Sequence, residues 1–148
     1  MSKLFDFLHP IADKEEKEVI ISKRFVKRDN DGNVILDEDG KAVLKPFRIR
    51  AVSQEENEAI AKSATRTHKD RSGQTVRDFD KVRYSRSLVV AATVEPDFRS
   101  SEMCQAFGTM DPMEVPGKML YSGEYQKLAD SIAELSGIGE DLEEAAKN

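Results

Sequence analysis

The sequence has no tryptophan, one cysteine and only two histidines among its 148 residues. The single thiol, Cys104, cannot form a disulfide within the chain. His9 and His68 do not stand at the spacing from Cys, Asp or Glu that a zinc site or a nucleophile–base pair requires. None of the eight glycines lies in a G-x-x-x-x-G-K-[ST] or G-x-G-x-x-G motif, so no nucleotide-binding loop is predicted. We therefore expect no catalytic residue, no metal site and no cofactor.

Long apolar runs are also missing. The longest, from Leu88 to Val94, is far shorter than the roughly 18 residues that a membrane-spanning helix needs. The start, MSKLFDFLHP, lacks the basic and apolar regions of a signal peptide. We expect a soluble, cytoplasmic protein with no membrane contact, in a compartment where a free thiol persists. A chain of this length can bury a core large enough to fold as a single domain without disulfides or metal.

Neither sign of charge dominates, but the charges are unevenly distributed. The 23 Lys and Arg residues and 28 Asp and Glu residues give a formal net charge of −5. Residues 1–40 carry 7 basic against 10 acidic residues, residues 41–94 carry 12 against 6, and residues 95–148 carry 4 against 12. The net charges of these thirds are −3, +6 and −8. The overall negative charge disfavours a nucleic-acid protein, although a local basic patch is compatible with it.

The basic residues of the middle third gather in one stretch, here called the basic segment. Its members are Arg66, Lys69, Arg71, Arg77, Lys81, Arg83 and Arg86. Three interpretations stay open: a solvated face or one paired with the chain's own acidic C-terminal third, a docking face for a protein partner, and a contact for a nucleic-acid backbone. In the last case the protein would be a small regulator, with Phe79 or Tyr84 available for stacking.

A second candidate for partner binding lies at the N-terminus. Residues 1–17 read as an arm that precedes the folded domain, and the arm carries four large apolar side chains: Leu4, Phe5, Phe7 and Leu8. These side chains either dock a partner or pack onto the sheet of the same chain. The sequence does not decide between the two.

Residues 18–52 predict a three-stranded antiparallel β-meander. Apolar runs at residues 19–26, 34–36 and 47–51 are separated by Asp31-Gly32 and Asp39-Gly40, dipeptides that favour tight hairpin turns. In the third run apolar residues alternate with Arg48 and Arg50, which predicts one buried and one solvated face. Pro46, which has no N–H, marks the start of regular pairing, a bulge or an edge position. No internal repeat is evident.

Residues 53–148 predict four or five helices packed on one face of this sheet, so the fold class is α+β. A capping box at Ser53 and Glu56 starts a helix that Ser72-Gly73-Gln74 ends, and a core helix is expected at about 78–95. A short helix capped by Ser100 or Ser101 and ended by Gly108 follows, and then a second piece that begins at Asp111-Pro112 and is limited by Pro116 and Gly117. A strongly periodic helix starts near Ser122 and is ended by Gly137. An acidic terminal helix is expected from 140 onward. The predicted organisation is an arm at 1–17 and one domain at 18–148.

Three segments, taken together and in order, resemble a known family. They are FRIRAVSQEENEAIAKSATR (residues 47–66), YSRSLVVAATVEPDFRSSEMCQAFG (84–108) and KMLYSGEYQKLADSIAELSG (118–137). In order and spacing they are similar to the tail assembly chaperones of contractile-tailed phages and of defective prophages in Gram-positive bacteria. The most specific pieces are residues 55–58, 94–97, and 119–120 followed by 123–125. One departure is Tyr121-Ser122, where Leu-Pro is more usual.

The resemblance implies a non-enzymatic chaperone that acts in the cytoplasm of a bacterial host. Such a protein binds the tape-measure and tail-tube proteins during tail morphogenesis and is absent from the finished tail. The sequence leaves open whether the chain forms a homo-oligomer, and it does not identify which partner segment is bound.

Overall fold

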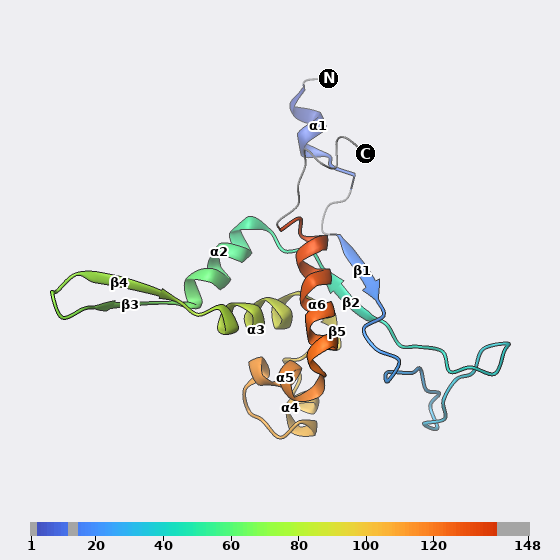
Figure 1. Cartoon of the computed structure of the whole chain (residues 1–148). Coiled ribbons are helices and arrows are strands. Elements are labelled where there is room, and N and C mark those ends of the chain that lie inside the picture. The colour runs from blue at the N-terminus through green and yellow to red at the C-terminus, as the bar shows by residue number, and fades with distance from the viewer. Residues whose placement is uncertain (1–2, 12–14, 139–148) are drawn as a thin grey trace.

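The computed structural model describes residues 3–11 and 15–138 and shows an α+β fold, as the sequence predicts (Figure 1). The strands are β1 (Glu16–Val19), β2 (Phe47–Arg50), β3 (Thr65–Lys69), β4 (Thr75–Phe79) and β5 (Thr93–Glu95). The helices are α1 (Leu4–Leu8), α2 (Gln54–Ser63), α3 (Lys81–Ala92), α4 (Ser101–Ala106), the 3₁₀ turn η1 (Pro112–Glu114), α5 (Val115–Met119) and α6 (Ser122–Leu135). Among these described elements, no helix has both the length and the apolar character needed to cross a bilayer.

The central sheet is antiparallel and has the order β1-β2-β5. Its middle strand shows the predicted alternation, because Phe47 and Ile49 are buried whereas Arg48 is exposed. Pro46 immediately precedes β2, as expected for a residue that cannot donate to a ladder. β1 begins at Glu16, within the segment predicted to be an arm. The three strands are not the predicted meander, since the third is β5, which follows α3 in the chain.

The middle part of the predicted meander forms a separate projection, which we call the triangular loop (residues 25–45; right of Figure 1). The Lys27 N–H donates to the Val43 carbonyl, the Val43 N–H to Ile35 and the Ile35 N–H to Lys27, at 2.8–2.9 Å. Each residue therefore pairs with both others, which closes a triangle instead of extending a flat sheet. The expectation of no internal repeat is wrong here, because these residues and their Asp-Gly turns recur every eight positions.

The segment after β2 was predicted to be one long helix, and this prediction is wrong beyond residue 63. Ser53 caps α2 as expected, its Oγ accepting a hydrogen bond from the Glu56 N–H at 3.2 Å. Residues 65–79 instead form the β3–β4 hairpin, whose strands contain three threonines, a valine and a phenylalanine, residue types that are favoured in strands. The Ser72-Gly73-Gln74 signal marks the hairpin turn, where Gly73 has φ +84° and the Asp70 carboxylate accepts from the Ser72 and Gln74 N–H groups.

The predicted core helix exists as α3 and is shorter than expected. Asp80 caps it, and four of its residues are buried: Leu88, Val89, Val90 and Ala92. The last part of the apolar run leaves the helix at Thr93 and becomes β5, which completes the sheet. Val and Thr side chains suit a strand, so this change agrees with their local preference.

The C-terminal helices follow the sequence prediction closely. Ser100 caps α4, Asp111 caps η1, and α6 ends before Gly137, which has φ +72°. One detail is wrong: Pro116 and Gly117 lie within α5 and do not end the preceding turn. The core is built from Phe98, Ile49, Leu128, Ile132, Val89 and Val115, all fully buried. α6 packs against β1, β2 and α3 and so covers the sheet. The predicted acidic helix from residue 140 lies outside the described residues.

Candidate interaction surfaces and polar junctions

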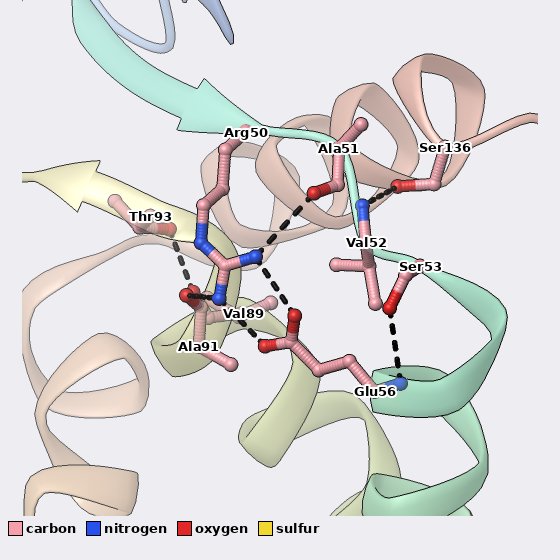
Figure 2. Close-up of polar contacts among 9 residues, drawn as sticks. All are labelled: Arg50, Ala51, Val52, Ser53, Glu56, Val89, Ala91, Thr93 and Ser136. Carbon is pink, nitrogen blue, oxygen red and sulfur yellow. Dashed lines mark hydrogen bonds and ion pairs between the residues drawn. The ribbon is translucent and has the colours of Figure 1, made fainter. Parts of the chain in front are cut away.

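The strongest polar constellation is a structural junction around Arg50 at the end of β2 (Figure 2). Its guanidinium makes two hydrogen bonds to the Glu56 carboxylate, at 2.8 and 2.6 Å, and donates to the Ala91 carbonyl at 2.9 Å. Glu56 therefore does not complete the predicted capping box, because it turns to Arg50 instead. The pair lowers the pKa of Glu56, chiefly through the guanidinium hydrogen bonds. Arg50 thus joins β2, α2 and the end of α3.

The same region is tied to the last helix. The Val52 N–H, just past β2, donates to the Ser136 hydroxyl at 2.9 Å, and the Thr93 hydroxyl donates to the Val89 carbonyl at 2.7 Å (Figure 2). Both bonds satisfy groups at the points where an element ends. The two bonds help to fix the helices on the sheet.

A second junction holds the chain between β1 and the triangular loop against the start of α6. Arg24 donates from Nε to the Glu124 carboxylate at 2.9 Å and from Nη2 to the Met119 carbonyl at 3.1 Å. Its guanidinium also lies over the Tyr121 ring, 4.0 Å from the centroid. The arginine hydrogen bonds lower the pKa of Glu124 from its ordinary value of 4.5 to about 2. Tyr121, which departs from the family pattern, therefore takes part in this contact.

We expect the second junction to make stability sensitive to acid. Because the folded-state pKa of Glu124 is depressed, its contribution is fully present above pH 4.5 and is lost as the pH falls toward 2. Chemical denaturation of Glu124→Gln between pH 6 and pH 3 should show a smaller acid loss of unfolding free energy than in the unmodified chain. Arg24→Gln should flatten the curve likewise, whereas Lys23→Gln, beside it, should keep the original shape. Parallel curves for all four proteins would contradict this assignment.

The apolar residues of the predicted arm lie on α1 and do not pack onto the sheet in the described structure. Leu4, Phe5, Phe7 and Leu8 are 61%, 42%, 82% and 64% exposed. The Phe5 ring lies beside the His9 ring, with centroids 4.2 Å apart and the two planes tilted by 40°. α1 lies at one end of the molecule, away from the hairpin and the triangular loop (Figure 1). The described structure therefore does not show the arm packed onto the sheet, and docking of a partner stays a prediction.

The basic segment is divided among three elements. Arg66 and Lys69 lie on β3, Arg71 in the hairpin turn, Arg77 on β4, and Lys81, Arg83 and Arg86 on α3. All seven side chains are exposed. Within residues 15–138, no ion pair joins them to the acidic C-terminal third. The structure therefore brings the seven residues into no single cluster.

Several of these cations line depressions in the protein surface. Lys81 and Arg86 line a cleft between α3 and α6, whose floor carries a 2.9 Å hydrogen bond between the Ser85 and Tyr125 hydroxyls. Arg77 lines a groove with Lys62, Thr65 and Thr67, at the base of the hairpin. Sequence reasoning missed Lys62, Thr65 and Thr67 because it continued the helix of Lys62 past residue 63, and on a helix these three residues would not lie beside Arg77.

The remaining sequence candidates have structural roles. Cys104 is half-buried and packs against the core together with Met103 and Phe107, which are also partly buried, and its thiol lies 3.8 Å from the Phe98 carbonyl. In the described part of the chain, no three His, Cys, Asp or Glu side chains come close enough to share a metal ion.

Comparison with known proteins shows that this chain belongs to a class of phage proteins that act in tail assembly. Residues 4–148 match the model of the family described as phage XkdN-like tail assembly chaperone protein. The chain belongs to this family. Its antiparallel sheet, its helices and all the residues of both polar junctions fall within the matched region.

Two relatives from Bacillus subtilis (strain 168) support the assignment. The chain is 38% identical to the protein YqbN and 37% identical to the protein XkdN of the phage-like element PBSX. Each comparison spans 139 residues, 90% of this chain and 85% of the relative. A crystal structure of YqbN superposes with a TM-score of 0.64 at 30% identity, covering 89% of this chain and 94% of that one. The fold and the role in phage tail assembly are therefore established by homology.

Proposed function

We propose that the chain is a non-enzymatic chaperone that binds the tape-measure and tail-tube proteins while a phage tail is built. It acts in the cytoplasm of the bacterial host and leaves before the tail is complete. The observation that carries this proposal is the family match over residues 4–148. The exposed apolar side chains of α1 and the projecting hairpin give such a chaperone two separate places to hold a partner.

Reversible binding of unassembled subunits needs accessible apolar contacts that a partner can bury. Phe7 and Leu8 supply such contacts on α1, because both side chains are more than 60% exposed. Large apolar side chains that become buried at the centre of an interface contribute more to affinity than the polar residues around them. We therefore place the apolar contact on α1.

The proposal is tested by co-expressing the chain with the tape-measure and tail-tube products of its own phage element. We expect both to be captured with the chain and to stay soluble longer than when expressed alone. In Phe7→Ser/Leu8→Ser, capture should fall about tenfold or more. The folding stability should stay within about 0.5 kcal/mol because the residues are exposed.

Leu36→Ser is the matched control, since Leu36 is a comparably exposed leucine, 59% accessible, in the triangular loop. It should leave capture by the α1 contact unchanged. If the unmodified chain captured neither tail product, the proposed function would be wrong. If Leu36→Ser and the α1 variant reduced capture of the tail proteins equally, the apolar contact would not be specific to α1.

A further inference from the structure

The β3–β4 hairpin has two chemically different faces. Residues paired directly across the two strands share a face, so Thr65 with Phe79, Thr67 with Arg77 and Lys69 with Thr75 lie on one side. Arg66 with Asp78 and His68 with Val76 lie on the other. We call the first side the cationic face. Its members are Thr65, Thr67, Lys69, Thr75, Arg77 and Phe79.

The cationic face carries positive charge without any carboxylate, whereas the opposite face is balanced. On the opposite face Asp78 stands across from Arg66, and its Oδ2 lies 3.3 Å from the His68 Nδ1. Lys69 and Arg77 supply the positive charge of the cationic face. Lys62 of α2 adds a third cation, because it lines the same groove as Thr67 and Arg77. Three cations and two accessible hydroxyls, those of Thr67 and Thr75, thus lie together on one surface. The Thr65 hydroxyl is already bonded to the Ala61 carbonyl, at 2.8 Å.

The hairpin is also open to an added strand. It projects from the body between α2 and α3, and within the described structure its sheet contains β3 and β4 alone (Figure 1). Its base is fixed by the Asp80 N–H, which donates to the Ala64 carbonyl at 2.8 Å. Beyond this base, every residue of the two strands is exposed except Val76 and Thr65, which are partly covered. A two-stranded ribbon is marginal by itself, so its free edges favour the addition of a third strand.

We propose that the cationic face is the docking site for an extended, acidic segment of a protein partner. The inference rests on the proposed chaperone function and specifies the chemistry of one bound segment. A strand added at a hairpin edge directs alternate side chains to the same face, so carboxylates at every second position would lie beside Lys69, Arg77 and Lys62. The exposed Phe79 ring at the base offers an apolar contact on the same face.

A peptide fits this site better than a nucleic acid does. The free backbone N–H and C=O groups of a strand edge pair with another polypeptide strand, and a phosphate backbone cannot reproduce that ladder. Phosphate binding draws its affinity from many cations acting together. Here the chain has a net charge of −5, and Asp70, Asp78 and Asp80 lie along the same hairpin and its exit.

The test uses the full chain, labelled for NMR, and a synthetic peptide of about ten residues in which glutamate and threonine alternate. We expect this peptide to shift the amide signals of residues 65–79. The same peptide with glutamine in place of glutamate should bind far more weakly. Lys69→Gln/Arg77→Gln should weaken binding about fivefold to tenfold, as expected for the loss of two exposed charge pairs.

Arg66→Gln/Arg71→Gln is the matched control, because it removes two positive charges from the same hairpin outside the cationic face. It should bind the peptide nearly as well as the unmodified chain, and both variants should unfold at the same temperature. Equal losses in the two variants, or no shift at residues 65–79, would overturn the proposal. Tighter, steeply salt-dependent binding of an oligothymidylate of similar length would assign the face to nucleic acid.

The two proposals can fail separately. If Lys69→Gln/Arg77→Gln captures the tape-measure and tail-tube proteins as well as the unmodified chain does, the docking inference is wrong and the chaperone function stands. If the unmodified chain binds the acidic peptide on the cationic face but captures neither tail protein, the function is wrong and the chemistry of the face stands.

Discussion

Replacing Phe98 with alanine is expected to lower the free energy of unfolding by about 3–5 kcal/mol, the largest effect of any single substitution considered for this chain. Phe98 is fully buried and lies just after β5, in the core that also contains Ile49 and Leu128. The loss combines the transfer of a large aromatic side chain to water with the cavity left behind. Urea denaturation followed by circular dichroism measures it.

Phe7→Ala is the matched control for this prediction. It makes the same chemical change in a side chain that is 82% exposed on α1, so stability should change by less than about 0.5 kcal/mol. Comparable losses for the two variants would mean that Phe98 does not occupy the core position described here. A loss only for Phe98→Ala would confirm that the segment after β5 is part of the folded body.

Replacing Arg50 with alanine is expected to lower the free energy of unfolding by about 1–3 kcal/mol, because it removes four hydrogen bonds, two to the Glu56 carboxylate and one each to the Ala51 and Ala91 carbonyls, and leaves Glu56 without its partner. The side chains of Arg50 and Glu56 are about one third exposed, which keeps the expected loss below that of a fully buried pair. Arg50→Lys should restore little of the lost stability, since an ammonium group cannot form the two parallel hydrogen bonds of a guanidinium. Thermal and urea unfolding provide the measurement.

Arg48→Ala serves as the control, two residues earlier on the same strand. The Arg48 side chain is 44% exposed and its ion pairs with Glu16 and Glu95 are long, at 3.9 and 3.8 Å. Its loss should cost less than about 1 kcal/mol. If both substitutions lowered the free energy of unfolding equally, the Arg50 junction of β2, α2 and α3 would contribute no more than an ordinary surface ion pair.

The features that the sequence predicted correctly are those controlled by local chemistry. The alternation of Phe47, Arg48 and Ile49 fixed one buried face of β2, and Ser53, Ser100 and Asp111 capped helices where their side chains could accept free N–H groups. The periodicity of α6 was equally informative, because a helix that covers a sheet must be apolar along one stripe. These signals need no knowledge of distant partners.

The wrong predictions concern pairing between distant segments. The sequence shows two tight turns in residues 18–52, but whether three short segments form a flat sheet or a triangle depends on which backbone group each residue pairs with. β5 could not be recognised from the sequence, because its residues belong to an apolar run that is also compatible with a helix. The strand order could not be inferred, because β5 pairs with β2 across an intervening stretch of chain that contains α2, the hairpin and α3.

The candidate surfaces show the same limit. The sequence identified Arg66 and Arg77 as members of one basic segment, yet they lie on opposite faces of the hairpin. Lys62 joins Arg77 across the boundary between α2 and β3 and could not be recognised while residues 53–71 were taken as one helix. For the apolar residues of the arm the sequence left partner docking and packing onto the sheet open, and only the structure shows that their side chains are exposed on α1.

The most direct test of the central claim, transient binding during tail assembly, is to quantify this chain in assembly intermediates and in finished tails of its phage element by mass spectrometry. The chaperone account predicts that the chain is bound to tape-measure and tail-tube proteins in the intermediates and is missing from finished tails. A fixed number of copies retained in finished tails, or no association with the intermediates, would contradict it.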